Sequence, residues 1–81
     1  MDNKVAVMAI IVEDTGAADE LNSVLHDFAP YIIGRMGLPY REKKINIISI
    51  ALDAPEDAIS SLAGRIVSIK GVSVKTVTAN V

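Results

Sequence analysis

Two strand-like segments carry apolar side chains on both faces, and this pattern limits the fold more than any other feature of the chain. The segments are Lys4–Glu13 and Ile45–Asp53, and both are rich in Val and Ile. Side chains alternate between the two faces of a strand, so a segment that is apolar at nearly every position is covered on both sides. The pattern therefore predicts two central strands of a sheet.

Each of these strands is followed by a segment with helical spacing. The first, Ala17–Phe28, ends before Pro30, which cannot continue the hydrogen-bond ladder of a helix. The second begins at Pro55, which suits the first helical position, and stops at Gly71. Its buried stripe is expected to contain Ala58 or Ile59, Leu62, Ile66 and Ile69.

The two remaining strands, Tyr31–Met36 and Val72–Thr78, have the character of sheet edges. Pro39 follows the first, and Lys75 lies within the second. The resulting order is β-α-β-β-α-β. With right-handed crossovers it predicts an α+β, ferredoxin-like sandwich in which a four-stranded antiparallel sheet has both helices on one face. We expect a single domain over residues 1–81.

The second face of this sheet has no helix to cover it. The central strands are nevertheless apolar on that face, and large apolar patches on a protein surface usually mark interfaces. A domain of 81 residues also buries only roughly 60–65% of the surface that its unfolded chain exposes. We therefore expect a homodimer or homotetramer that buries the free sheet face, an edge strand, or both.

Composition excludes several classes of protein. A hydrophobic fraction of 51% excludes disorder, and the absence of cysteine excludes disulfides, thiolate metal sites and thiol catalysis. The net charge of −2 does not favour non-specific binding to nucleic acid, so direct DNA binding is not expected. No apolar run reaches the ~18–20 residues of a membrane span, and residues 5–12 lack a basic leader. We expect a cytoplasmic protein with no membrane partner.

The stretch Tyr31–Arg41 is the strongest candidate for a ligand-binding site. Arginine suits bidentate recognition of a carboxylate or phosphate, and flanking glycines leave the backbone unobstructed. Strict alternation along the strand places Arg35 on one face with Tyr31 and Ile33, opposite Ile32. The alternative is that the arginines of this stretch form ion pairs across an oligomer interface. The candidate ligand-binding residues here are Gly34, Arg35, Met36, Gly37, Tyr40 and Arg41.

Gly16 is a further candidate, because it lies between the first strand and the first helix. Backbone amides at such a position can bind an anion, although a simple turn glycine explains the residue equally well. Asp14 or Thr15 can cap the helix there. The only histidine, His26, is expected on the polar side of the first helix, and one histidine supplies too few ligands for a metal. We predict no catalytic residues, no metal site and no cofactor.

Several runs spread over nearly the whole chain resemble the iron-only hydrogenase system regulator family. Members of that family are small stand-alone ACT-like domains, and their fold is similar to the C-terminal regulatory domain of the nickel-responsive repressor. The first of the runs is the most specific of them. The runs are Gly34-Arg35-Met36-Gly37-Leu38-Pro39-Tyr40, then Ile47-Ile48-Ser49, then Leu62-x-Gly64-Arg65, and finally Gly71-Val72-x-Val74-Lys75.

The resemblance implies a role linked to the expression or maturation of the iron-only hydrogenase. ACT domains typically bind amino acids or other small effectors at subunit interfaces, often at the turn that corresponds here to Asp14–Ala17. The nickel repressor uses histidines and a cysteine, so its nickel site is not expected in a chain with one histidine and no cysteine. Because no DNA-binding segment is expected beside this domain, a transcriptional role would require a partner or another mode of binding.

Three functional interpretations follow. The leading one is a non-enzymatic regulatory module that senses a small molecule or docks on a protein partner as an oligomer. The first alternative is a small ferredoxin-like dimeric enzyme, which would need a base such as His26 in a pocket beside a carboxylate. The second is an oligomeric nucleic-acid binder, which would need to gather Arg35, Arg41, Lys43 and Lys44 on one surface.

Overall fold

The computed structural model describes residues 2–81 and confirms the predicted order of elements. Short 3₁₀ turns precede and follow the first helix and join the second strand to the third. The strands are β1 (Asn3–Val12), β2 (Ile32–Tyr40), β3 (Ile45–Pro55) and β4 (Val72–Ala79), and the helices are α1 (Ala18–Asp27) and α2 (Glu56–Val67).

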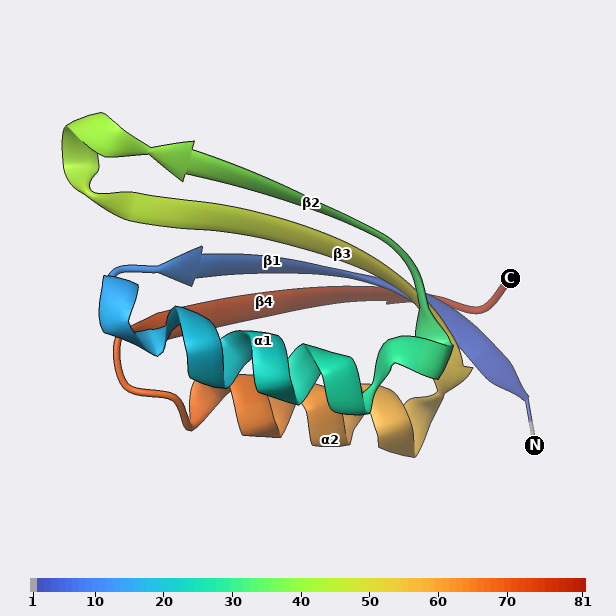
Figure 1. Ribbon diagram of the computed structural model, residues 1–81. Coiled ribbons are helices and arrows are strands. Elements are labelled where there is room, and N and C mark those ends of the chain that lie inside the picture. Colours follow the sequence, from blue (N-terminus) through green and yellow to red (C-terminus); the bar gives the residue numbers. More distant parts are fainter. Residues whose placement is uncertain (1) are drawn as a thin grey trace.

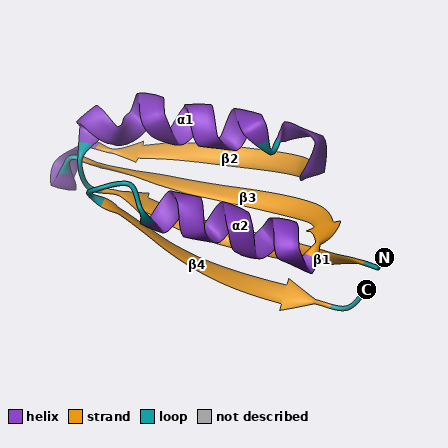
Figure 2. Cartoon of the chain, turned by 90° about the horizontal axis from the view of Figure 1, so that it is seen from below, coloured by secondary structure: helices purple, strands orange, loops and turns teal. Residues whose placement is uncertain are grey.

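The four strands form one antiparallel sheet in the order β2-β3-β1-β4. The two strands that are apolar on both faces therefore lie in the centre, as predicted, and β2 and β4 form the edges. Both helices lie on the same side of the sheet (Figure 1). Figure 2 shows them side by side, with α1 next to β2 and α2 next to β4. This is the predicted ferredoxin-like, ACT-like architecture.

The hydrophobic core lies between the sheet and the two helices. Every second residue of β1 is buried there, and the helices contribute the residues of their apolar stripes. Asp19 and Glu20 in the first turn of α1, and Glu56 and Asp57 in that of α2, complement the positive end of each helix dipole. The largest fully buried side chains are Met8, Ile10, Leu21, Leu25, Ile50, Leu52, Leu62, Ile66 and Val12.

The opposite side of the sheet carries no helix and is here called the open face. Its exposed hydrophobic residues include Leu38 at 57%, Met36 at 68% and Val77 at 72% exposure. The protein exposes 5249 Å², compared with roughly 4,700 Å² for an average folded monomer of 8.6 kDa. The open face consists of Val5, Val7, Ala9, Ile11, Gly34, Met36, Leu38, Tyr40, Ile45, Ile47, Ser49, Ala51, Asp53, Ser73, Lys75, Val77 and Ala79.

Several element boundaries differ from the sequence prediction. β2 continues past Met36 to Tyr40, because an edge strand tolerates Pro39. β3 continues to Pro55, which has extended backbone angles and precedes the first helical residue instead of being it. Ile69 is buried as expected, but it lies beyond the end of α2 at Val67.

Residues 2–81 contain no helix with the length and apolar character that crossing a lipid bilayer requires.

Candidate functional site

A bulge in β2 decides the direction of Arg35. The register shifts between Ile32 and Gly34, so that Ile32 pairs with Leu52 and Arg35 pairs with Ile50. Leu52 and Ile50 are both buried against the helices. Because directly opposed residues of neighbouring strands point to the same face, Ile32 and Arg35 both lie on the helix-covered face.

This arrangement corrects the sequence prediction. Strict alternation predicts that Arg35 lies opposite Ile32 and shares its face with Ile33. That assignment is wrong, because the bulge inserts one extra residue between Ile32 and Arg35 and changes the parity of the strand.

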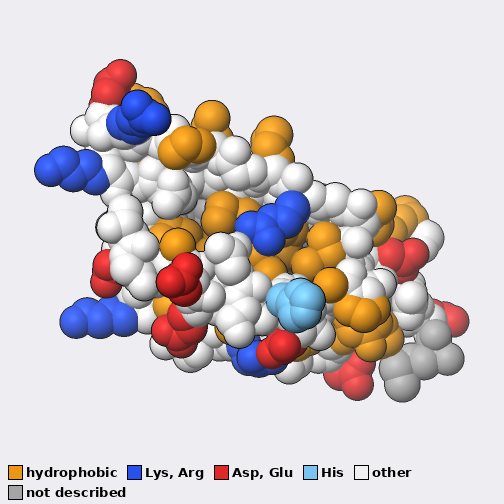
Figure 3. All heavy atoms as spheres, in the orientation of Figure 1, with side chains coloured by type: hydrophobic (Ala, Val, Ile, Leu, Met, Phe, Trp, Pro, Cys, Tyr) orange, Lys and Arg blue, Asp and Glu red, His pale blue; other side chains and the backbone are white. Residues whose placement is uncertain are grey.

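On the helix-covered face, Arg35 contacts α1. Its Nη2 donates a 3.0 Å hydrogen bond to Oδ1 of Asn22. His26, which is exposed, follows Asn22 by four residues, so the two side chains project from the same side of the helix. Figure 3 shows the histidine close to a basic side chain, with hydrophobic side chains exposed around both between β2 and α1.

Asn22 is the residue that sequence reasoning missed in this group. The pair Asn22 and His26 is visible in the sequence as one polar side of a helix. That spacing alone does not indicate a site, because polar pairs of this kind are common on solvated helix faces. Asn22 becomes part of a candidate site only because the bulge turns Arg35 toward it.

The other residues of the candidate stretch lie elsewhere. Met36 and Tyr40 are on the open face, and the Tyr40 hydroxyl donates a 3.3 Å hydrogen bond to Oε2 of Glu42. Arg41 begins the 3₁₀ turn Arg41–Lys43 that leads into β3. Tyr40 and Arg41 therefore lie at the hairpin end, about five strand positions or 16 Å from Arg35.

Gly34 and Gly37 have space around them. A Cβ added to either glycine would meet no atom within 4 Å, and neither residue has positive φ. Gly34 lies on the open face opposite Ala51, and Gly37 lies on the helix-covered face opposite Ile48. Neither the packing within one subunit nor the backbone conformation therefore requires glycine at these positions.

Gly16 belongs to a compact turn at the end of β1. Asp14 caps the turn, and its Oδ1 accepts a 2.9 Å hydrogen bond from the Gly16 backbone N–H. Gly71 packs against the same turn with φ of 81°, and its carbonyl accepts a 2.7 Å bond from the N–H of Glu13. Asp14 therefore caps this 3₁₀ turn and not α1 itself, whose N-cap Ala17 makes no side-chain hydrogen bond, and the Gly16 amide already has a partner within the chain.

The seven predicted ligand-binding residues therefore occupy three places. Arg35 and Gly37 lie on the helix-covered face of β2. Gly34, Met36, Tyr40 and the adjoining Arg41 lie on the open face or at its hairpin end. Gly16 lies in the turn after β1.

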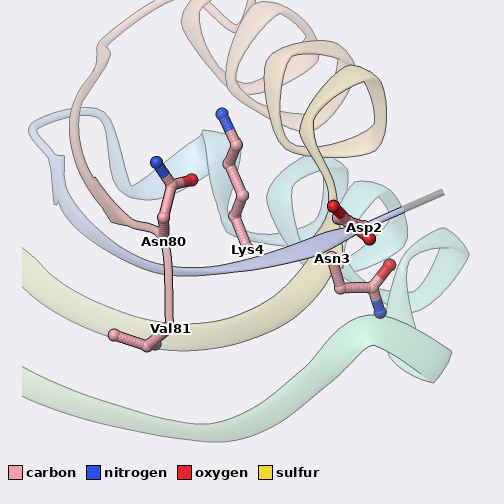
Figure 4. A pocket seen from close by; sticks show the side chains of 5 residues that line it. All are labelled: Asp2, Asn3, Lys4, Asn80 and Val81. Atoms are coloured by element: carbon pink, nitrogen blue, oxygen red, sulfur yellow. The ribbon is translucent and has the colours of Figure 1, made fainter.

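Two surface depressions lie away from all of these residues. One is formed where the two ends of the chain lie side by side, and Figure 4 shows Lys4 and Asn80 projecting to the same side of it. Lys4 also forms a 3.1 Å ion pair with Glu56. The other lies between the end of α1 and the start of α2. The first is lined by Asp2, Asn3, Lys4, Asn80 and Val81, and the second by Phe28, Tyr31, Pro55, Asp57, Ala58 and Ser61.

His26 and the Asp and Glu side chains of residues 2–81 are all exposed. Residues 2–81 contain no group of three or more His, Asp or Glu side chains that could hold a metal ion. His26 is exposed on α1 and is not among the residues that line the two depressions. Asp57 accepts a hydrogen bond from the backbone N–H of Ala58, which is consistent with its predicted place at a helix start.

Comparisons with known proteins agree with this architecture. A search of the curated proteins found no match. The chain is 35% identical to an uncharacterized protein from Thermotoga maritima, with a TM-score of 0.91 over 95% of this chain and 98% of that one. An ACT domain from the GTP pyrophosphokinase of Chlorobium tepidum is 18% identical, with a TM-score of 0.78 over 93% of this chain and 99% of that one.

A formyltetrahydrofolate deformylase from Pseudomonas putida is 13% identical and gives a TM-score of 0.68 over 95% of this chain and 29% of that one. At such low identity, it and the Chlorobium domain show a shared fold and nothing more. The model of the family described as "Iron-only hydrogenase system regulator, putative" matches residues 4–76. The match and the Thermotoga structure bear out the resemblance seen in the sequence, and the chain therefore belongs to the iron-only hydrogenase system regulator family.

Proposed function

We propose that this protein is a non-enzymatic regulatory module of the iron-only hydrogenase system that works as a homo-oligomer. Two copies associate through their open faces, and the assembly senses a small molecule or docks on a protein partner. One observation carries the proposal: most residues on the side of the sheet without helices are apolar, and Val7, Met36, Leu38 and Val77 among them are exposed in a single subunit.

The size of the open face suits a stable interface. Strands of 8 to 11 residues at about 3.3 Å per residue, spaced about 4.8 Å apart, give the face an area of roughly 600 Å². Two such faces bury roughly 1,200 Å² together, which reaches the lower range of specific protein interfaces. Association through this face would remove most of the exposed apolar strand residues from water.

Gly34 supports the same interpretation. It lies on the open face, and nothing within its own subunit occupies the space where a side chain would be. A glycine that a strand does not need often marks the close approach of another backbone or a ligand. The adjacent open-face residue of β2, Met36, is 68% exposed and would pack against a second copy.

Analytical ultracentrifugation over a wide range of protein concentrations tests the assembly. We expect the wild type to be oligomeric at micromolar concentration. Leu38→Glu and Val77→Glu should each shift the equilibrium to monomers, because both residues are exposed in one subunit but covered in the proposed oligomer.

Val67→Glu is the matched control. Val67 is 60% exposed on α2, on the helix side of the sheet, so the substitution adds the same charge away from the open face. It should leave the oligomeric state unchanged. A wild type that sediments as single chains, or a Val67→Glu variant that dissociates as readily as Leu38→Glu, would contradict the proposal.

A further inference from the structure

Two exposed arginines contact α1, and their surroundings differ. Arg65 on α2 donates to Oδ2 of Asp27 at 2.9 Å and stacks on the Phe28 ring, with 5.5 Å from its guanidinium carbon to the ring centroid. Its charge is therefore balanced by a carboxylate and an aromatic face. Arg35 has only the neutral amide oxygen of Asn22, and no carboxylate of residues 2–81 lies within 4.0 Å of it.

The hydrogen bond to Asn22 orients Arg35 without neutralising it. A guanidinium carries five N–H donors in a fixed planar arrangement, and one bond to Asn22 leaves most of them free. An amide acceptor holds the group in place but adds no negative charge. The remaining donors are therefore positioned for an anion that comes from outside the subunit.

The surroundings favour one side of Arg35 for that anion. His26 lies one helical turn after Asn22 and contributes a ring N–H donor on the same side of α1. Asp19 lies one turn before Asn22, so its negative charge disfavours an anion on that side. Gly37, the next residue of β2 on the helix-covered face, also has open space beside it, but β2 runs in the opposite direction to α1, so that space lies toward Asp19 and not toward His26 (Figure 1).

We propose that Arg35, oriented by Asn22, binds a small oxyanion, either a carboxylate or a phosphate group, on its His26 side. This inference rests on the proposed regulatory function, for which it supplies the chemical class of the effector. The guanidinium pairs with two oxygens of the anion, and His26 donates to one of them. If the anion is part of a larger ligand, the hydrophobic side chains exposed between β2 and α1 contact the remainder of that ligand (Figure 3).

The test uses the full chain, labelled with ¹⁵N and titrated separately with sodium acetate and with inorganic phosphate. Sodium chloride at matched ionic strength controls for general screening. We expect saturable shifts of the Arg35 side-chain N–H, the Asn22 side-chain amide and the His26 ring signals. Saturation by acetate identifies a carboxylate site, saturation by phosphate identifies a phosphate site, and either result supports the proposal.

Three variants locate the binding. Arg35→Gln should weaken it about 10-fold or more, since the charged donors are lost. Arg35→Lys keeps the charge but not the planar pair of donors, and we expect an intermediate affinity. Arg65→Gln removes the other arginine that contacts α1 and should leave the affinity unchanged. Shifts that fail to saturate with both anions, or saturable binding that survives Arg35→Gln, would overturn the assignment.

The oligomeric state of the same samples separates this inference from the proposed function. If anions bind at Arg35 but the wild type sediments as monomers, the oxyanion site stands and the assembly does not. If the wild type is oligomeric and neither anion binds, the assembly stands and the oxyanion site is wrong.

Discussion

The two faces of the sheet are built from the same strands and nearly the same residue types, but only one is covered. In β1, Ile10 is fully buried against the helices, whereas Ile11 points to the open face and is half-buried. Two helices are enough to enclose one side of a four-stranded sheet. The comparison shows that an apolar residue in a central strand does not by itself locate the core, because the helices determine which face is covered.

Substitutions on the two faces are expected to affect different quantities, namely the stability of each subunit and the association of subunits. Residues on the helix-covered face contribute to the free energy of unfolding of each subunit. Residues on the open face contribute little to a lone subunit, and their burial depends on a second copy. Protein concentration therefore distinguishes the two classes, because only association depends on it.

The largest effect is expected from adjacent substitutions on opposite faces. Ile10→Ala removes fully buried methyl groups and should lower the free energy of unfolding by about 2–5 kcal/mol at any protein concentration. Ile11→Ala should cost much less at low concentration and more at high concentration, where the proposed oligomer forms. Urea denaturation followed by circular dichroism at both concentrations measures the difference. If Ile10→Ala and Ile11→Ala lowered the free energy of unfolding equally at both protein concentrations, the proposed difference between the two faces would be contradicted.

Gly71→Ala is expected to have the next largest effect. Gly71 has φ of 81°, and a Cβ there would lie 2.5 Å from the Asp14 Cβ. The substitution should destabilise the subunit by about 1–3 kcal/mol, because it strains the backbone and separates β4 from the turn after β1. Thermal unfolding measures the loss. Because the contact lies within one subunit, the oligomeric state should not change, and dissociation caused by this variant would be unexpected.

Asp14→Ala tests the other partner of this contact. The Asp14 carboxylate caps the turn before α1, and its loss should cost about 1 kcal/mol. Asp14→Asn keeps an acceptor at this position and should restore most of the stability. If the Ala and Asn variants were equally unstable, the hydrogen bond to Gly16 would not be the source of the effect.

Gly34→Ala is expected to have small effects of opposite sign on the stability of the isolated subunit and on the stability of the proposed oligomer. Glycine in a strand costs roughly 0.5–1 kcal/mol relative to alanine, and the structure leaves room for a methyl group at this site. The isolated subunit should therefore become slightly more stable, whereas the proposed oligomer should become weaker. Denaturation at low concentration and sedimentation at high concentration measure the two effects. An unchanged oligomer would show that no close approach occurs at Gly34.

Most of the fold could be predicted from the sequence, because it depends on local periodicity. The apolar character of both faces in residues 4–13 and 45–53, together with the helical spacing between the strands, determined the order of elements and the central position of β1 and β3. The apolar open face followed from the same patterns. These signals are local, and side-chain periods of 2 and 3.6 residues report them directly.

The arrangement around Arg35 could not be predicted in this way. Whether Arg35 faces the helices depends on the bulge at residue 33, and a bulge is defined by pairing with β3, which lies more than ten residues away in the sequence. Its contact with Asn22, and the approach of Gly71 to Asp14, likewise join segments that only the folded chain brings together. The sequence by itself determined which elements form and which of their faces are apolar. The tertiary structure alone decided which polar side chains meet, because one inserted residue in an edge strand reverses the direction of every side chain beyond it.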